Sequence, residues 1–119
     1  MSIDYAVLSK SPWTRNSLDK AIAKMKSSLP FHWVMFEDSA IADLVGPDGQ
    51  QLLSVYRSRP ILCREHAASM IVGPPKTFHL WTDVSVPAYA PQGPAMDALN
   101  AFARACRGTA HQVVCCTSP

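Results

Sequence analysis

One short segment, Cys63-Arg-Glu-His66, places a nucleophile close to a base in the sequence. A Cys thiolate activated by an imidazole is the reactive group of many hydrolases and transferases. On a strand the Cys63 and His66 side chains would face opposite ways, whereas on a helix they could share a face. A small Cys/His-dependent enzyme is therefore one alternative function, but closeness in sequence alone assigns no catalytic residue.

A zinc site is the second chemistry that these residue types permit, because zinc takes tetrahedral sets of Cys and His ligands. The paired ligand spacings typical of such sites are missing from the sequence. The vicinal Cys115 and Cys116 would also point to opposite faces of a strand. We therefore expect free thiols that pack as small core residues, with neither a metal nor another cofactor. The residues considered as ligands are Cys63, His66, His111, Cys115 and Cys116.

Charge is unevenly distributed along the chain, although the totals nearly balance. Basic residues gather on the first predicted helix and its approach, whereas the segment from Glu37 to Tyr56 contains acidic residues but no Lys or Arg. This segment is either a solvated hairpin or a surface complementary to a basic partner, where charge would speed and orient association. The basic residues are Lys10, Arg15, Lys20, Lys24 and Lys26, and the acidic ones are Glu37, Asp38, Asp43 and Asp48.

Trp81 lies on the polar side of a predicted strand, between His79 and Asp83. An aromatic residue in this position is either packed under a helix or an anchor of an interface. If the acidic segment binds a partner, the contact residues that we expect are Asp43, Asp48, Trp81 and Asp83.

Two amphipathic helices are predicted. Apolar residues from Leu18 to Leu29 recur at helical spacing and predict a helix over about Thr14–Ser28, ended by Pro30. A second apolar stripe predicts a helix from Met96 to Cys106, with Gly108 as the glycine that follows its end.

Apolar runs and turn signals predict the strands. Gly46-Pro-Asp-Gly49 between two runs indicates a hairpin, and an aromatic run with apolar residues on both faces indicates a central strand. Between residues 77 and 86, alternation places Phe78 with Val84 and Val86 on one face. The segment Pro60–Val72 is interpreted as a strand, with a helix around Arg64 to Ala68 as the alternative. The other predicted strands are Ile3–Leu8, Phe31–Phe36, Ile41–Val45, Gln51–Tyr56, Thr77–Val86 and His111–Cys116.

The predicted fold is a single α+β domain over residues 1–119, with two amphipathic helices packed on one face of a mainly antiparallel sheet. The 119 residues carry 11 Lys+Arg and 9 Asp+Glu, and this net charge of +2 argues against direct binding of nucleic acid. The N-terminus lacks a secretory pattern, and every apolar run is shorter than the roughly 20 residues of a membrane helix. The expected location is the cytoplasm, with no membrane partner.

The opening Met1 to Lys10, the capped helix, the aromatic strand and the Asp48-Gly49 hairpin together resemble small immunity proteins of bacterial contact-dependent growth inhibition and related polymorphic toxin systems. The resemblance covers most of the chain in organisation and carries over no functional residue. It implies a protein that binds a cognate toxin domain, often a nuclease, and blocks its active site. An inhibitor or adaptor of phage type that binds a bacterial complex is an alternative.

Overall fold

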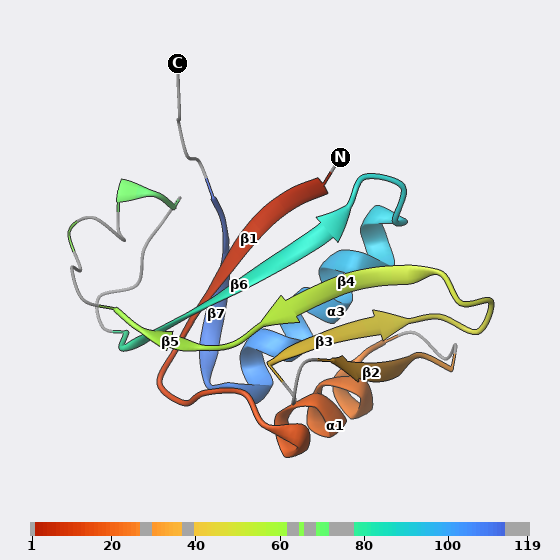
Figure 1. The fold of residues 1–119 in the computed structure, drawn as a ribbon, viewed down its shortest axis with the longest axis horizontal. Coiled ribbons are helices and arrows are strands. Elements are labelled where there is room, and N and C mark those ends of the chain that lie inside the picture. The colour runs from red at the N-terminus through yellow and green to blue at the C-terminus, as the bar shows by residue number, and fades with distance from the viewer. Residues whose placement is uncertain are drawn as a thin grey trace.

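The computed structural model describes residues 2–26, 30–36, 40–61, 65, 69–71 and 78–113. In this part of the chain, a seven-stranded antiparallel sheet carries helices α1 and α3 on one face (Figure 1). The α+β class predicted from the sequence is confirmed. The elements are β1 (Ser2–Ser9), α1 (Arg15–Lys24), β2 (His32–Phe36), β3 (Ile41–Val45), β4 (Gln51–Tyr56), β5 (Arg59–Pro60), β6 (Leu80–Pro87), α3 (Gln92–Ala105) and β7 (Gly108–Gln112).

The sheet has the strand order β2-β3-β4-β6-β1-β7, and the short β5 pairs with β6. The hairpin of β3 and β4 forms as predicted, with Gly49 at a φ of 82° in its turn. The prediction of a central aromatic strand is wrong, because β2 lies at the end of the described sheet and pairs there with β3. Of its two aromatic residues, Trp33 is buried in the core and Phe36 is exposed. Trp33 donates its indole N–H to the Leu18 carbonyl at 2.9 Å, and its ring centroid is 6.2 Å from that of Phe102.

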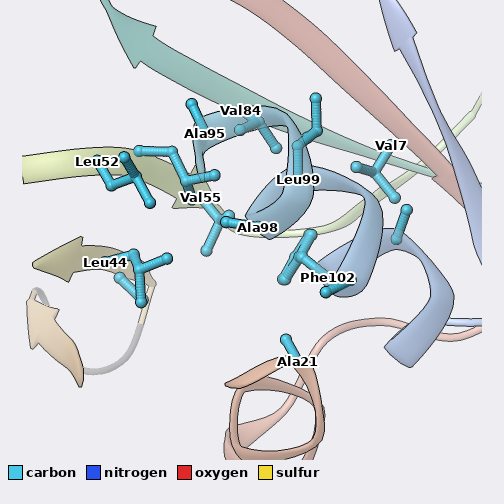
Figure 2. Packing of buried hydrophobic residues seen from close by; sticks show 14 of the residues in the cluster. Val7, Ala21, Leu44, Leu52, Val55, Val84, Ala95, Ala98, Leu99 and Phe102 are labelled. Carbon is cyan, nitrogen blue, oxygen red and sulfur yellow. The ribbon is translucent and has the colours of Figure 1, made fainter. Parts of the chain in front are cut away.

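The main core lies between the sheet and the two helices, as Figure 2 shows. Alternation along the strands directs every second side chain to this side. Helix α3 contributes buried alanines as well as Leu99 and Phe102, and small residues allow a helix to approach the strands closely. The strand side chains labelled in Figure 2 are Val7, Leu44, Leu52, Val55 and Val84.

Helix α1 begins at a capping box, in which Thr14 accepts a hydrogen bond from the Ser17 amide while the Ser17 hydroxyl accepts one from the Thr14 amide. The helix ends at Lys24, which is earlier than the predicted Ser28. The reason is tertiary, since the Lys26 amide donates to the Asp97 carboxylate of α3 at 2.8 Å and so leaves the helical ladder.

The connection from α3 to β7 differs from the prediction. Gly108 does not cap α3, because Arg107 takes the left-handed conformation there, with a φ of 63°. Gly108 is the first residue of β7, where a Cβ would clash with the Leu8 carbonyl oxygen. The close approach of β1 and β7 therefore requires glycine. β7 begins at Gly108, three residues before the predicted start at His111. Cys115 and Cys116, which the prediction placed on this strand, lie outside the described residues.

A second, smaller cluster of buried side chains occupies the other face of the sheet at one end. It consists of Ala6, Leu8, Ile71, Phe78 and Trp81. The prediction that Phe78 shares a face with Val84 is therefore wrong. The alternation starts only at Leu80, where β6 begins.

Residues 60–72, interpreted from the sequence as a strand, are only partly described. Arg59–Pro60 form β5, and Ile71 forms an isolated bridge with Val113. Glu65 and Ser69 have helical backbone, so the strand prediction is wrong at these two positions. Both Cys63 and His66 lie outside the described residues.

Candidate functional site

The face of the sheet opposite α1 and α3 gathers carboxylates from three strands. On β1, β3 and β6, Val7, Leu44 and Val84 belong to the core under the helices. Because side chains alternate along a strand, Asp4, Asp43 and Asp83 project from the opposite face. We call this surface the helix-free face (Figure 1).

Four polar residues lie in one row across the helix-free face, and we call them the polar rung: Asp43, Ser54, Ser85 and Asp4. Asp43 pairs with Ser54, Ser54 with Ser85, and Ser85 with Asp4 in the strand register. The Ser54 hydroxyl donates to Asp43 Oδ1 at 2.6 Å, and Gln51 donates in turn to Ser54. At the usual strand spacing, the two terminal carboxylates are about 14 Å apart. The rung therefore presents separated negative charges, one of which is held by hydrogen bonds.

Asp83 lies beside the rung on β6, and both of its carboxylate oxygens are engaged. The Trp81 indole N–H donates to Oδ1 at 2.7 Å, and Arg59 Nη2 donates to Oδ2 at 3.2 Å. The Arg59 guanidinium also lies 5.9 Å from the centroid of the Trp81 ring. The side chains of Arg59 and Asp83 are 61% and 50% exposed, so the ion pair between them contributes little and is readily exchanged. Asp83 is thus oriented by Trp81 while its charge remains accessible.

A hollow of about 550 Å³ opens on the same face. Its polar lining includes Asp4, Asp83, Ser85 and Arg59, and its apolar lining includes Trp81. The volume is within the range of roughly 300–1,000 Å³ found for ligand pockets. The hollow could accept a long side chain of a partner, with carboxylates at its wall.

An apolar row borders the charged part of the face. Phe36, Ile41 and Tyr56 are neighbours in the register of β2, β3 and β4. Phe36 is 46% exposed and Tyr56 is 39% exposed, so both rings present apolar surface to solvent. Aromatic residues next to polar ones are typical of protein interfaces.

The structure places three of the four predicted contact residues on one face of the sheet, where Trp81 donates to Asp83. Asp43 and Asp83 share the helix-free face, whereas Asp48 lies in the exposed hairpin turn, where it accepts the Gln50 amide at 3.2 Å. Asp48 borders a separate hollow of about 390 Å³, together with Phe31 and prolines before and within α3. Trp81 is only 5% exposed and belongs to the small cluster with Ile71 and Phe78, so its side chain offers little surface to a partner.

Asp4 is the site residue that the sequence reasoning missed. The one signal that could have found it is the alternation of β1, in which Tyr5 and Val7 face the core and Asp4 faces away from it. Nothing local indicated that β1 pairs with β6, which places Asp4 opposite Ser85.

Groups for nucleophilic or metal chemistry are sparse in the described part of the chain. It contains no cluster of three or more His, Cys, Asp and Glu residues suited to a metal ion. Cys106 is a free thiol that is 1% exposed. Burial raises the pKa of this thiol to about 11, and a hydrogen bond with the Ser17 side chain lowers the pKa by less than burial raises it. Cys106 is thus a poor nucleophile at neutral pH.

His111 lies on β7, and its ring forms a hydrogen bond with the Thr109 hydroxyl at 2.7 Å.

Among the described residues, neither helix has the length and apolar character needed to cross a membrane. No protein-family model matches the chain, and searches of the curated proteins and of the solved structures give no significant match.

Proposed function

We propose that the protein is a non-enzymatic inhibitor that binds a basic protein partner through its helix-free face. In this proposal it is an immunity protein that neutralises a cognate bacterial toxin domain by covering the active site of the toxin. The observation that carries the proposal is the set of three carboxylates, Asp4, Asp43 and Asp83, on the one face of the sheet that the helices leave uncovered.

Charge complementarity supports a basic partner. A toxin domain that acts on nucleic acid needs Lys and Arg around its active site to hold phosphates. Separated carboxylates on the polar rung and at Asp83 would attract such a surface, raise the association rate and fix the orientation of the complex. The overall charge of +2 does not oppose this, because association responds to the local field of the interface.

The construction of the face also supports binding. The hydrogen bonds from Ser54 to Asp43 and from Trp81 to Asp83 already orient two carboxylates, so less side-chain entropy is lost when a partner binds. Phe36 and Tyr56 supply exposed aromatic surface beside these charges. A partner arginine could replace Arg59 on Asp83, since that exposed pair is weak.

Co-purification with the product of the adjacent reading frame tests the proposal, together with protection of growing cells from that product. We expect a stable complex and protection of the cells. The immunity function would be refuted if the product of the adjacent reading frame is not a toxin and the protein protects cells from no toxin.

Charge-neutralising variants test the face itself. In Asp43→Asn the amide oxygen can still accept the Ser54 hydroxyl, so the change removes charge with little effect on the fold. Combined with Asp4→Asn, it should lower the association rate about tenfold at low salt and weaken its salt dependence. Asp19→Asn on α1 is the matched control, because this exposed carboxylate lies on a helix of the other face. Equal effects of the control and the double variant would show that binding uses another surface.

A further inference from the structure

A hollow of about 330 Å³ at the C-terminal end of α3 is lined by three basic residues, Lys10, Arg104 and Arg107. Ser9, Gly108 and Thr109 contribute to its lining as well. The hollow is separate from the helix-free face and shares no lining residue with the hollow there.

Three segments bring these cations together. Lys10 follows β1, Arg104 lies in the last turn of α3, and Arg107 lies in the turn before β7. The Lys10 amide donates to the Arg107 carbonyl at 3.4 Å, and the Arg107 amide donates to the Arg104 carbonyl at 3.0 Å. The backbone therefore fixes the spacing of the three residues.

The backbone at Arg107 carries a cost. Its φ of 63° lies in the left-handed region, which non-glycine residues rarely adopt. Residues held in this region cluster at functional sites, where the surrounding structure compensates for the strain. The left-handed conformation ends α3 here as it ends many helices, and an arginine in place of the usual glycine or asparagine adds a third cation at the hollow.

The positive charge of the hollow is not neutralised within the described residues. No carboxylate lines it, and the ion pairs of the described chain join Arg15 to Asp19 and Arg59 to Asp83. The dipole of α3 favours one cation near its C-terminus, which accounts for Arg104. It does not account for three cations at one place. All three residues are exposed, so solvent screens their mutual repulsion, and a bound anion would gain contacts with all of them.

We propose that this hollow binds a phosphate group. A phosphate carries up to two negative charges and presents several acceptor oxygens, which match converging Arg and Lys donors better than a single carboxylate does. The ligand could be the free ion or a phosphomonoester, since both present the same group. The proposal rests on the basic hollow and is independent of the proposed inhibitor function.

Titration with inorganic phosphate at constant ionic strength, followed by amide chemical shifts, tests the site. We expect saturable shifts at Lys10, Arg107 and Gly108, with affinity that falls as salt is added. A parallel titration with glycerol phosphate distinguishes the source. Tighter binding of the monoester would support a phosphorylated ligand, and tighter binding of inorganic phosphate would support the free ion. The absence of saturable shifts at tens of millimolar of either compound would overturn the proposal.

Two variants and one control complete the experiment. Arg107→Asn removes the cation but suits the left-handed backbone, so the fold should be retained, and Arg104→Gln removes the second cation. Each should weaken phosphate binding about tenfold, as expected for a lost charge-assisted hydrogen bond. Arg57→Gln is the matched control, because this exposed arginine lies between β4 and β5, away from the hollow. If Arg57→Gln loses as much phosphate affinity as these two variants, the loss comes from the lower net charge of the protein, and the proposed site is refuted.

Discussion

The Cys106 thiol should make the protein less stable as the pH rises through the range from 9.0 to about 11. The side chain is 1% exposed, and burial raises its pKa from the ordinary 9.0 to about 11. In the unfolded chain the thiol loses its proton near 9.0, while the folded protein still holds it. The unfolded state thus binds fewer protons in this range, so the free energy of unfolding decreases with pH.

The size of the effect follows from the two pKa values. Each unit of difference corresponds to about 1.36 kcal/mol, so a difference of two units is worth about 2.7 kcal/mol. This contribution is fully present below pH 9.0, declines between the two pKa values and is lost above about 11.

Urea unfolding of the native chain and of Cys106→Ala across this pH range measures the contribution. Lysines, tyrosines and the other cysteines titrate in both proteins, so their effects cancel in the difference. The packing loss in Cys106→Ala is independent of pH, so the stability advantage of the native chain should shrink by about 2.7 kcal/mol. A difference that stays constant with pH would refute the burial of this thiol as the cause.

Three further substitutions test how the backbone of β7, α3 and α1 is constrained. Gly108→Ala should destabilise the protein by at least about 2 kcal/mol in urea unfolding, because its Cβ would meet the Leu8 carbonyl, and a loss under about half a kcal/mol would contradict that contact. Gly93→Ala in α3 should give no gain in stability, although its Cβ meets no atom within 4 Å apart from its chain neighbours, because a residue with a Cβ directly before Pro94 is disfavoured in helical backbone; a clear rise in melting temperature would contradict this. Thr14→Ala should cost about 1 kcal/mol of unfolding free energy by removing the cap of α1, whereas unchanged stability would mean that the capping box contributes nothing.

The charged part of the candidate site could be predicted only in pieces. The sequence indicated Asp43 because its segment contains no Lys or Arg, and Asp83 because it lies beside Trp81 on the polar face of a predicted strand. It could not join them with Asp4, since the pairing of β1 with β6 links residues about 80 positions apart and leaves no local pattern. Trp81 shows the same limit, because its burial depends on Phe78 and Ile71 folding over the far face of the sheet.

The sequence by itself determined the local elements, because their causes are local. Apolar runs and turn signals predicted most of the strands, helical spacing predicted α1 and α3, and Gly46-Pro-Asp-Gly49 predicted the hairpin turn. Tertiary structure alone decided the order of the strands, the edge position of β2 and the convergence of Lys10 with Arg107. The physical reason is that packing, strand pairing and a close backbone approach such as that at Gly108 depend on partners distant in sequence, which a periodic pattern cannot specify.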